Sequence, residues 1–494
     1  MTNLLLALNF EPQIESLGSE YWDVVDAARF PRTELRFRND ALLRQLGIEP
    51  DAVEDHHLEQ AYGCFEARTP LLALRYHGYQ FGTYNPLLGD GRGFLYGQLR
   101  DRFGQLQDLG TKGSGTTPWS RGGDGRLTLK GGVREIIASE ALHRLGVTTS
   151  RTLCLVETGE KLWRGDEPSP TRSSVMMRMA RTHLRFGTCE RLLHLRDAQS
   201  LERLLRHVVD VYYPLIAAAY PVQEGNAASA IQAQLLAFYA ELVERVARLT
   251  AEWMAAGFTH GVLNTDNMSL LGESFDYGPF AFLDQWEPGF TAAYFDQTGL
   301  YAYGRQPGTC HNNLRLLQEP LAMLLPRQPM EQSLETFAPT YQSHYRACMQ
   351  RRLGLPSSFD GNGNIEGGGG DAVRKTLALL DAWPIGYGAF FAGLAAQIST
   401  KGLPEEPEAL LPVVLDGAEP ARKVWLDWRD RWWTQQREAL SANPAEAQAI
   451  NARLQRWNLV KTPIRSVIEE FWQAIDQDDD WQPLQAWLKA ICVD

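Results

Sequence analysis

Three oxygen-bearing side chains lie close together in the segment HGVLNTDNMSLLGESFDYGP, which runs from residue 260 to 279. Asn267 and Asp276 offer hard oxygen ligands suited to Mg²⁺ or Mn²⁺, ions that usually take few ligands from the protein. Asp266 precedes Asn267, and in an extended segment it would point to the other side and could accept a substrate proton. An isolated Asp-Asn or Asp-Tyr-Gly sequence is also typical of turns that cap short strands. The rest of the chain must decide between these interpretations.

A lysine and a glutamate are placed where phosphate chemistry would need them. Transfer of a phosphoryl or nucleotidyl group requires cations held against the phosphates more than it requires covalent chemistry from the protein. Lys112 ends the predicted strand LQDLGTK, and Glu135 lies in the next predicted helix, GGVREIIASEAL. Such a glutamate orients the lysine head group toward phosphate. Spacing alone does not separate this pair from a surface lysine and an unrelated helix glutamate.

Two glycine-rich segments flank the predicted strand lysine. LLGDGRG contains Gly89, Gly91 and Arg92, and TKGSGTTPWSRGGDGR contains Asp124 and Gly125. Either segment alone is more typical of a hairpin turn than of a loop that covers phosphates. Two GDGR tetrapeptides around one lysine favour phosphate loops.

Two arginines complete the set of candidate phosphate ligands. Arg178 and Arg185 lie in the segment MMRMARTHLRFG. Fork-shaped guanidinium groups suit phosphate oxygens, although an isolated arginine more often pairs with a carboxylate. His183, between them, is expected to be a packed or capping histidine.

The elements that must position these residues change character along the chain. Residues 71–85, 93–99, 106–113 and 173–180 read as strands, and residues 148–165 read as a hairpin that turns at Thr158-Gly159. Apolar residues at helical spacing predict a helix over 131–146 that ends at Gly146. Beyond about residue 190 long amphipathic patterns dominate, for example over 200–215 and 230–257, and a strand-turn-strand unit carries the acidic segment. The Gly- and Asn-rich segment 356–372 reads as a mobile loop.

Bulk composition restricts the function classes. The chain has 494 residues, of which 44% are hydrophobic and 22% charged, which is ordinary for a folded protein with more than one core. Its formal net charge of −12 argues against a general nucleic-acid or anionic-membrane binder. The segment MTNLLLALNFEP lacks the features of a secretory signal, and the apolar stretches are short, so we expect a cytoplasmic protein that does not span a membrane. The six cysteines are scattered without zinc-site spacing.

Five blocks of sequence occur together in an order and at spacings that carry a resemblance. They are YHGYQFGTYNPLLGDGR, KGSGTTPWSRGGDGR, VREIIASEAL, RTHLRFGT and HGVLNTDNMSLLGESFDYGPFAFLD. In them the chain resembles the selenoprotein O family, YdiU-type protein adenylyltransferases with a protein-kinase-like fold. The resemblance implies an α+β, two-lobed protein with a small mixed N-lobe at 1–190, a larger, mainly helical C-lobe at 191–355 and a helical C-terminal extension at 356–494.

The resemblance also implies an activity and roles for the candidate residues. The family binds ATP in an inverted orientation and transfers AMP to Ser, Thr or Tyr hydroxyls of proteins, so ATP, Mg²⁺ or Mn²⁺ and protein substrates are the expected partners. It implies Asp266 as proton acceptor, Asn267 and Asp276 as metal ligands, and Glu135 as the partner of Lys112. The implied nucleotide contacts come from Gly89, Gly91, Arg92, Lys112, Asp124, Gly125, Arg178, Arg185 and Asp276.

Some positions depart from the family pattern. Tyr79 stands where histidine is common, and Thr116 stands where arginine is frequent. Cys492 resembles the redox-active cysteine that family members often carry near the C-terminus. In some relatives that cysteine pairs with one at the position of Ala292, so a Cys310–Cys492 disulfide and two independent thiols are both open here.

Two alternative functions remain open. A conventional kinase would transfer the γ-phosphate with the same ions and side chains. A nucleotide-binding pseudokinase could act as a scaffold that presents the helical half to a partner, although such proteins usually lose one of the residues Asp266, Asn267 or Asp276. Which phosphorus lies in line with the acceptor hydroxyl distinguishes the two enzymes.

Overall fold

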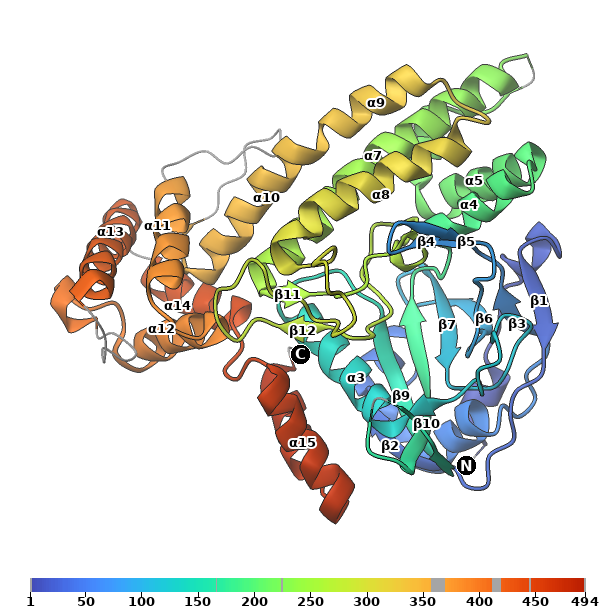
Figure 1. Cartoon of the computed structure of the whole chain (residues 1–494), viewed down its shortest axis with the longest axis horizontal. Helices are drawn as coiled ribbons and strands as arrows, with labels where there is room; N and C mark the ends of the chain where they lie inside the picture. Colours follow the sequence, from blue (N-terminus) through green and yellow to red (C-terminus); the bar gives the residue numbers. More distant parts are fainter. Residues whose placement is uncertain are drawn as a thin grey trace.

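The chain combines a sheet-containing first part with later parts that are almost entirely helical (Figure 1). The computed structural model describes residues 2–165, 167–223, 225–356, 369–410, 419–443 and 446–492. The α+β prediction is confirmed. Residues 357–368, most of the loop predicted at 356–372, lie outside the described residues.

The main sheet is antiparallel, with strands in the order β1-β3-β6-β7-β10-β9-β2 and with β8 paired to β10 beside this path. Alternate side chains enter two cores, as the pleat of a strand requires. Met176 belongs to the core that contains the apolar residues of α3, whereas Val175 and Met177 belong to a separate core. Strands β7 and β10 are therefore buried along almost their whole length, although LQDLGTK and TRSSVMMRMA both contain several polar residues. The strands are β1 (Trp22–Val25), β2 (Glu34–Arg38), β3 (Leu71–Leu74), β6 (Leu95–Arg100), β7 (Leu106–Lys112), β8 (Leu127–Thr128), β9 (Arg151–Leu162) and β10 (Thr171–Ala180).

The predicted hairpin turn at Thr158-Gly159 is wrong. Strand β9 continues through these residues, and the chain reverses only between Leu162 and Thr171. Gly159 has a φ of +75°, and the β9–β10 register shifts between Arg172 and Ser174, so the glycine accompanies an irregularity within the strand. A turn-forming dipeptide inside a long strand therefore marked a local distortion and not a reversal.

The predicted strand over residues 71–85 is three strands. The first, β3, ends at Leu74, and a separate hairpin follows with β4 (Gly78–Gln80) paired to β5 (Thr83–Asn85). The strands predicted at 93–99 and 106–113 correspond to β6 and β7.

The predicted helix after Lys112 is α3 (Leu129–Arg144), which packs on β9 and β10. Its start is fixed by Thr128, whose side chain accepts a hydrogen bond from the Gly131 N–H. Gly146, with a φ of +84°, follows its end as predicted.

The helical part is organised by the long helix α7 (Ala227–Ala256), which contacts α8, α9 and α10 and ends at the left-handed Gly257. The predicted strand-turn-strand unit follows as β11 (Phe258–Thr259) and β12 (Ala281–Phe282), which pair antiparallel. None of the described helices is both long and apolar enough to cross a lipid bilayer. The other helices are α1 (Asp40–Gln45), α2 (Asp55–Leu58), α4 (Phe186–His194), α5 (Ala198–Tyr212), α6 (Pro214–Ala219), α8 (Gln306–Leu321), α9 (Arg327–Glu335), α10 (Phe337–Arg352), α11 (Gly369–Ala382), α12 (Tyr387–Lys401), α13 (Glu419–Ala442), α14 (Glu446–Trp457), α15 (Arg465–Asp478) and α16 (Gln482–Ile491).

Candidate active site

One cleft, with a volume of about 660 Å³, collects most of the residues that the sequence singles out. This volume is typical of sites that hold a ligand of nucleotide size. The predicted residues that line it are Gly89, Gly91, Arg92, Lys112, Asp124, Gly125, Arg178, Arg185, Asp266 and Asp276. Glu135 lies behind Lys112, whereas Asn267 and Cys492 are not among the lining residues.

The Lys112–Glu135 pair forms as the spacing suggests. Lys112, the last residue of β7, is 6% exposed, and its ammonium donates to the Glu135 carboxylate from α3. The same ammonium lies 2.6 Å from Oδ1 of Asp276. The buried Glu135 and the partly exposed Asp276 therefore hold the lysine at the end of β7 and fix its charge in the cleft.

Asp276 is an ionised carboxylate in a cationic environment. Burial alone would raise its pKa, but the charges of Lys112, Arg178 and Arg185 outweigh burial and hold the pKa well below its ordinary value. Arg178 reaches the same Oδ1 at 3.3 Å. The backbone of Asp276 has a φ of +66°, a left-handed conformation that aspartate tolerates better than most residues. The site therefore keeps Asp276 charged across the pH range in which proteins work.

Arg178 is itself positioned by the histidine that the sequence suggested was packed. The Arg178 Nε–H donates to Nε2 of His183 at 3.1 Å, and the His183 Nδ1 lies 3.2 Å from a carboxylate oxygen of Asp108. Burial lowers the pKa of His183, so the ring is neutral and can accept from Arg178 on one nitrogen while donating to Asp108 on the other. His183 supports the cleft without lining it.

Asp266 differs from Asp276 in its electrostatic state. It lies in a turn of 3₁₀-helix, Thr265–Asn267, and not in the extended segment that the sequence suggests. Its side chain is 9% exposed, and Oδ1 has no hydrogen-bond partner among the described residues. Burial raises its pKa to about 6, with Arg185 opposing the shift and Asp276 adding to it. A buried, unpartnered carboxylate with a pKa near neutrality is suited to accept a proton.

The turn that carries Asp266 is held from three sides. Arg185 donates to the Asp266 carbonyl at 3.0 Å, and its guanidinium lies over the Tyr76 ring with the central carbon 4.1 Å from the ring centre. The Thr265 hydroxyl donates to Glu190 at 2.7 Å and accepts from the Tyr79 N–H of the β4–β5 hairpin at 2.7 Å. Arg185 is 1% exposed. It lines the cleft and, through its hydrogen bond to the Asp266 carbonyl, also supports this turn.

The glycine-rich segments form one wall in which added side chains would collide. A Cβ at Gly89 would lie 2.3 Å from the Trp119 ring, and one at Gly91 would lie 2.8 Å from the Trp119 carbonyl oxygen. Gly125 has a φ of +68°, and its Cβ would lie 2.2 Å from the Gly115 backbone. The two loops are tied together, since the Ser120 hydroxyl donates to the Gly91 carbonyl at 2.5 Å. The absence of side chains lets backbone and ligand approach closely here.

Asp124 is engaged by an arginine that sequence reasoning missed. Its carboxylate lies 2.8 Å and 3.0 Å from the two terminal nitrogens of Arg164, which lies between β9 and β10. This bidentate pair ties the second glycine-rich loop to the sheet. No local motif surrounds Arg164, so no sequence signal indicated it. Trp119 and Arg121 also line the cleft, and both lie inside the block KGSGTTPWSRGGDGR, where they could have been noticed.

Asp276 lines the cleft and offers a carboxylate oxygen, and Asn267, outside the lining, offers an amide oxygen. Both are donor types that fit a hard divalent cation. The Asn267 side chain is oriented by its Nδ2–H, which donates to the Val262 carbonyl at 2.9 Å and leaves the amide oxygen available for another partner. Asp276 presents a second carboxylate oxygen besides the one held by Lys112. The residues present are compatible with Mg²⁺ or Mn²⁺.

The two cysteines considered for a disulfide occupy different environments. Cys310 is fully buried in α8, where burial raises its pKa to about 12, and Cys492 is exposed at the end of α16. The structure joins no pair of described cysteines by a disulfide. The redox role of Cys492 stays a prediction.

Comparison with known proteins assigns the chain to a family. The family model described as "Protein adenylyltransferase SelO" matches residues 4–492. The chain belongs to the SelO family. Proteins named "Protein nucleotidyltransferase YdiU" are 52% identical in Synechococcus elongatus, over 99% of this chain and 95% of the relative, and 51% identical in Gloeobacter violaceus, over 97% and 94%. The relative of that name in Pseudomonas putida is 35% identical over 79% of this chain and 76% of its own length.

Membership of the SelO family confirms the predicted enzyme class. The protein is a nucleotidyltransferase, and the match covers nearly the whole chain, including the cleft and the C-terminal helices. The resemblance found in five short blocks therefore extends over nearly the whole chain.

Proposed function

We propose that the protein transfers AMP from ATP to Ser, Thr or Tyr hydroxyls of other proteins in a reaction that requires Mg²⁺ or Mn²⁺. The observation that carries the proposal is the pairing, in one cleft, of two aspartates with opposite electrostatic states. Asp276 is ionised and surrounded by cations, whereas Asp266 is buried and has a pKa of about 6. Opposite shifts of this kind separate a charge-binding acid from a proton-accepting one.

The phosphate-binding role falls to the basic side of the cleft. Lys112, Arg178 and Arg185 converge there, and the glycine-rich wall brings backbone close to the ligand. Fixed positive charge in a cleft of this kind stabilises the charge that develops on phosphate oxygens during transfer. Arg92 is exposed at the same cleft and can meet a phosphate from the solvent side.

The chemical step is an attack by the acceptor hydroxyl oxygen on the α-phosphorus. That oxygen forms a bond to phosphorus, the bond from phosphorus to the bridging oxygen of the β-phosphate breaks, and pyrophosphate leaves. Asp266 accepts the hydroxyl proton, which its raised pKa permits near neutral pH. The divalent ion, held by Asn267 and Asp276, would add positive charge beside the phosphates.

We further propose that the sheet-containing part and the helical part correspond to the two lobes of a protein-kinase-like fold. The predicted limits are 1–190 for the first lobe, 191–355 for the second and 356–494 for the extension. The pairing of a strand lysine with a helix glutamate beside a metal-binding aspartate supports this assignment. A cytoplasmic location fits the reaction, which draws on ATP.

Intact-mass measurement tests the proposal directly. The purified protein, alone and with candidate acceptor proteins, is incubated with ATP and Mg²⁺ or Mn²⁺, beside an Asp276→Ala control. An AMP-sized addition that the control lacks supports adenylyl transfer. A phosphate-sized addition would make the protein a conventional kinase and overturn the proposal. Binding of ATP with no transfer to any acceptor under either metal would favour the scaffold.

A further inference from the structure

Helix α3, which carries Glu135, contacts the last described helices as well as the sheet. It packs on β9 and β10 and also contacts α15 and α16. Figure 1 shows α15 near α3. Phe471 and Trp472 of α15 and Leu484 and Leu488 of α16 share one apolar core with the α3 residues. The most C-terminal part of the described chain therefore packs on the helix that positions the cleft lysine.

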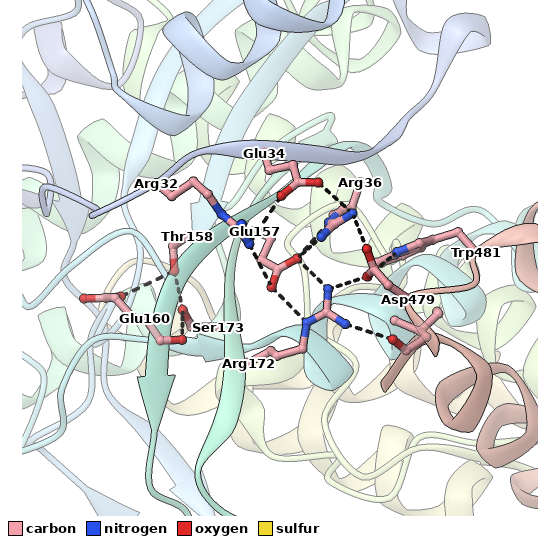
Figure 2. A network of polar contacts seen from close by, with 11 residues as sticks. Arg32, Glu34, Arg36, Glu157, Thr158, Glu160, Arg172, Ser173, Asp479 and Trp481 are labelled. Carbon is pink, nitrogen blue, oxygen red and sulfur yellow. Dashed lines mark hydrogen bonds and ion pairs between the residues drawn. The ribbon is translucent and has the colours of Figure 1, made fainter. Parts of the chain in front are cut away.

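A network of ion pairs fastens these helices to the sheet (Figure 2). Its centre is Glu157 of β9, whose side chain is 5% exposed and lies 2.7 Å from both Arg172 of β10 and Arg36 of β2. Arg172 also lies 2.6 Å from Asp479, and Arg36 lies 3.1 Å from the other oxygen of the same carboxylate. Asp479 thus forms ion pairs with two arginines that Glu157 of the sheet already binds.

Asp479 lies at the carboxyl end of α15, where its carboxylate and the helix carbonyls bind the same arginine. It follows the last residue of α15 in a left-handed conformation with a φ of +51°. Arg172 donates to the Ile475 carbonyl at 2.8 Å as well as to the Asp479 carboxylate, so one guanidinium satisfies the carboxyl end of α15 and the aspartate beyond it. The Trp481 indole N–H, 3.3 Å from Asp479, joins α16 to the same point.

Two further contacts attach the ends of α3 to the same C-terminal segment. Near its start, Lys130 lies 2.7 Å from Glu469 of α15. At its end, Arg144 donates to the Gln455 and Arg456 carbonyls of α14, and Arg456 donates back to the Arg144 carbonyl. Each guanidinium therefore satisfies the carboxyl end of the other helix. Helix α3 is therefore attached to the C-terminal segment at both of its ends.

We propose that residues 446–491 form a positioning element for the nucleotide site, with the contact between Arg172 and Asp479 as its latch. The element holds α3 against the sheet so that Glu135 keeps Lys112 directed into the cleft. The inference rests on the proposed function, because it assigns a nucleotide role to the pair that the element supports. The residues of the latch do not line the cleft, so they act through α3 and not on the ligand.

Two variants release the latch without removing apolar packing. Asp479→Asn removes the charge while keeping a residue that tolerates the left-handed backbone. Arg172→Gln removes the contacts to Glu157, Ile475 and Asp479 together. The control is Glu319→Gln, which breaks an exposed ion pair with Arg327 elsewhere in the helical part.

Two measurements on the full-length protein decide the outcome. Hydrogen exchange of residues 129–144 should become faster in both variants and stay unchanged in the control, because loss of the latch lets α3 open locally. The dissociation constant for Mg-ATP should rise about threefold in Asp479→Asn, since the aspartate is half exposed, and about tenfold in Arg172→Gln. In a Glu135→Gln background Asp479→Asn should have no further effect on that constant, because the latch acts through Glu135.

The inference is overturned if α3 exchanges at the parent rate in both variants, or if Asp479→Asn weakens ATP binding equally with and without Glu135. Failure of the proposed function looks different. In that case the parent protein does not bind Mg-ATP, and the nucleotide role of the element falls with it. The rate of hydrogen exchange of residues 129–144 in the two variants then still shows whether the contact between Arg172 and Asp479 holds α3.

Discussion

The ammonium of Lys112 lies 2.6 Å from the carboxylate of Asp276, although 164 residues separate the two in the chain. This contact joins the end of a sheet strand to the loop before β12, and Glu135 joins it from α3. Strand β7, helix α3 and the loop before β12 therefore meet at the Lys112 ammonium. Stability and nucleotide binding should both depend on it.

Lys112→Met should weaken both properties at once. Methionine keeps the length of the side chain but leaves the Glu135 carboxylate buried without its partner. Breaking a buried ion pair from one side costs about 3 kcal/mol or more, so we expect a lower free energy of unfolding in urea together with a loss of ATP binding. Lys375→Met is the matched control, because the pair between Lys375 and the exposed Asp427 should be worth less than about 1 kcal/mol. Equal losses in the two variants would contradict the role given to Lys112.

Asp266→Asn should abolish transfer and stabilise the protein. The pKa of Asp266 is raised from 3.8 to about 6, so the folded state holds this proton more tightly than the unfolded chain does. Stability contributed by protonation is complete below pH 3.8 and is lost as the pH rises through about 6. At neutral pH the ionised side chain therefore destabilises the fold by about 3 kcal/mol, which asparagine removes.

The melting temperature of Asp266→Asn, measured from pH 4 to pH 8, checks this sign. The variant should exceed the parent at pH 7, and the difference should shrink toward pH 4. Asp101→Asn supplies a control of opposite sign. Burial alone would raise the pKa of Asp101, but hydrogen bonds from Gln45, Gln107 and backbone amides lower it. That substitution should destabilise the protein. If the parent protein melts at a higher temperature than Asp266→Asn at pH 7, the ionised Asp266 carboxylate does not destabilise the fold.

The cleft was predictable from sequence because its motifs, each ambiguous alone, occur together in the order and at the spacings of one family. Lys112, Glu135, Asp266 and Asp276 could each be placed on a strand, helix or turn, and the structure brings them together. The pairing of Asp124 with Arg164 could not be foreseen, because it depends on where the β9–β10 connection reverses. Because the turn was predicted at Thr158-Gly159, the actual connection between Leu162 and Thr171, which contains Arg164, was not recognised.

The attachment of the C-terminal helices to α3 could not be predicted from the sequence either. Amphipathic patterns predict that α15 and α16 have an apolar face, but they do not say which surface covers it. The partner surface is set by long-range ion pairs such as Arg172–Asp479, whose members are 307 residues apart. Composition and periodicity carry no record of such contacts.

The rate of transfer should fall at acidic pH through a single ionisation. With saturating ATP, a base with a pKa of about 6 must lose its proton before it can accept one from the acceptor hydroxyl. Asp276 does not contribute, because the charges of Lys112, Arg178 and Arg185 keep it ionised over the same range. Single-turnover rates should therefore change little between pH 8 and pH 7 and should be about tenfold lower at pH 5 than at pH 8. A rate that stays constant down to pH 5 would exclude Asp266 as the base.

The second glycine-rich loop offers a comparison between two left-handed glycines. Gly122 has a φ of +81° and Gly125 a φ of +68°, so alanine at either position costs roughly 1 kcal/mol of backbone strain. The space around them differs. Nothing lies within 4 Å of a Cβ at Gly122, whereas one at Gly125 would lie 2.2 Å from the Gly115 backbone.

Gly125→Ala must therefore displace the loop, while Gly122→Ala need not. We expect Gly125→Ala to weaken Mg-ATP binding roughly tenfold or more, because the cleft wall shifts relative to Lys112, and Gly122→Ala to lose much less. Isothermal titration of both variants, with melting temperatures to confirm folding, makes the comparison. Similar affinities in the two variants would mean that backbone strain alone governs the loop. A selective loss in Gly125→Ala would show that the close approach to Gly115 shapes the phosphate side of the cleft.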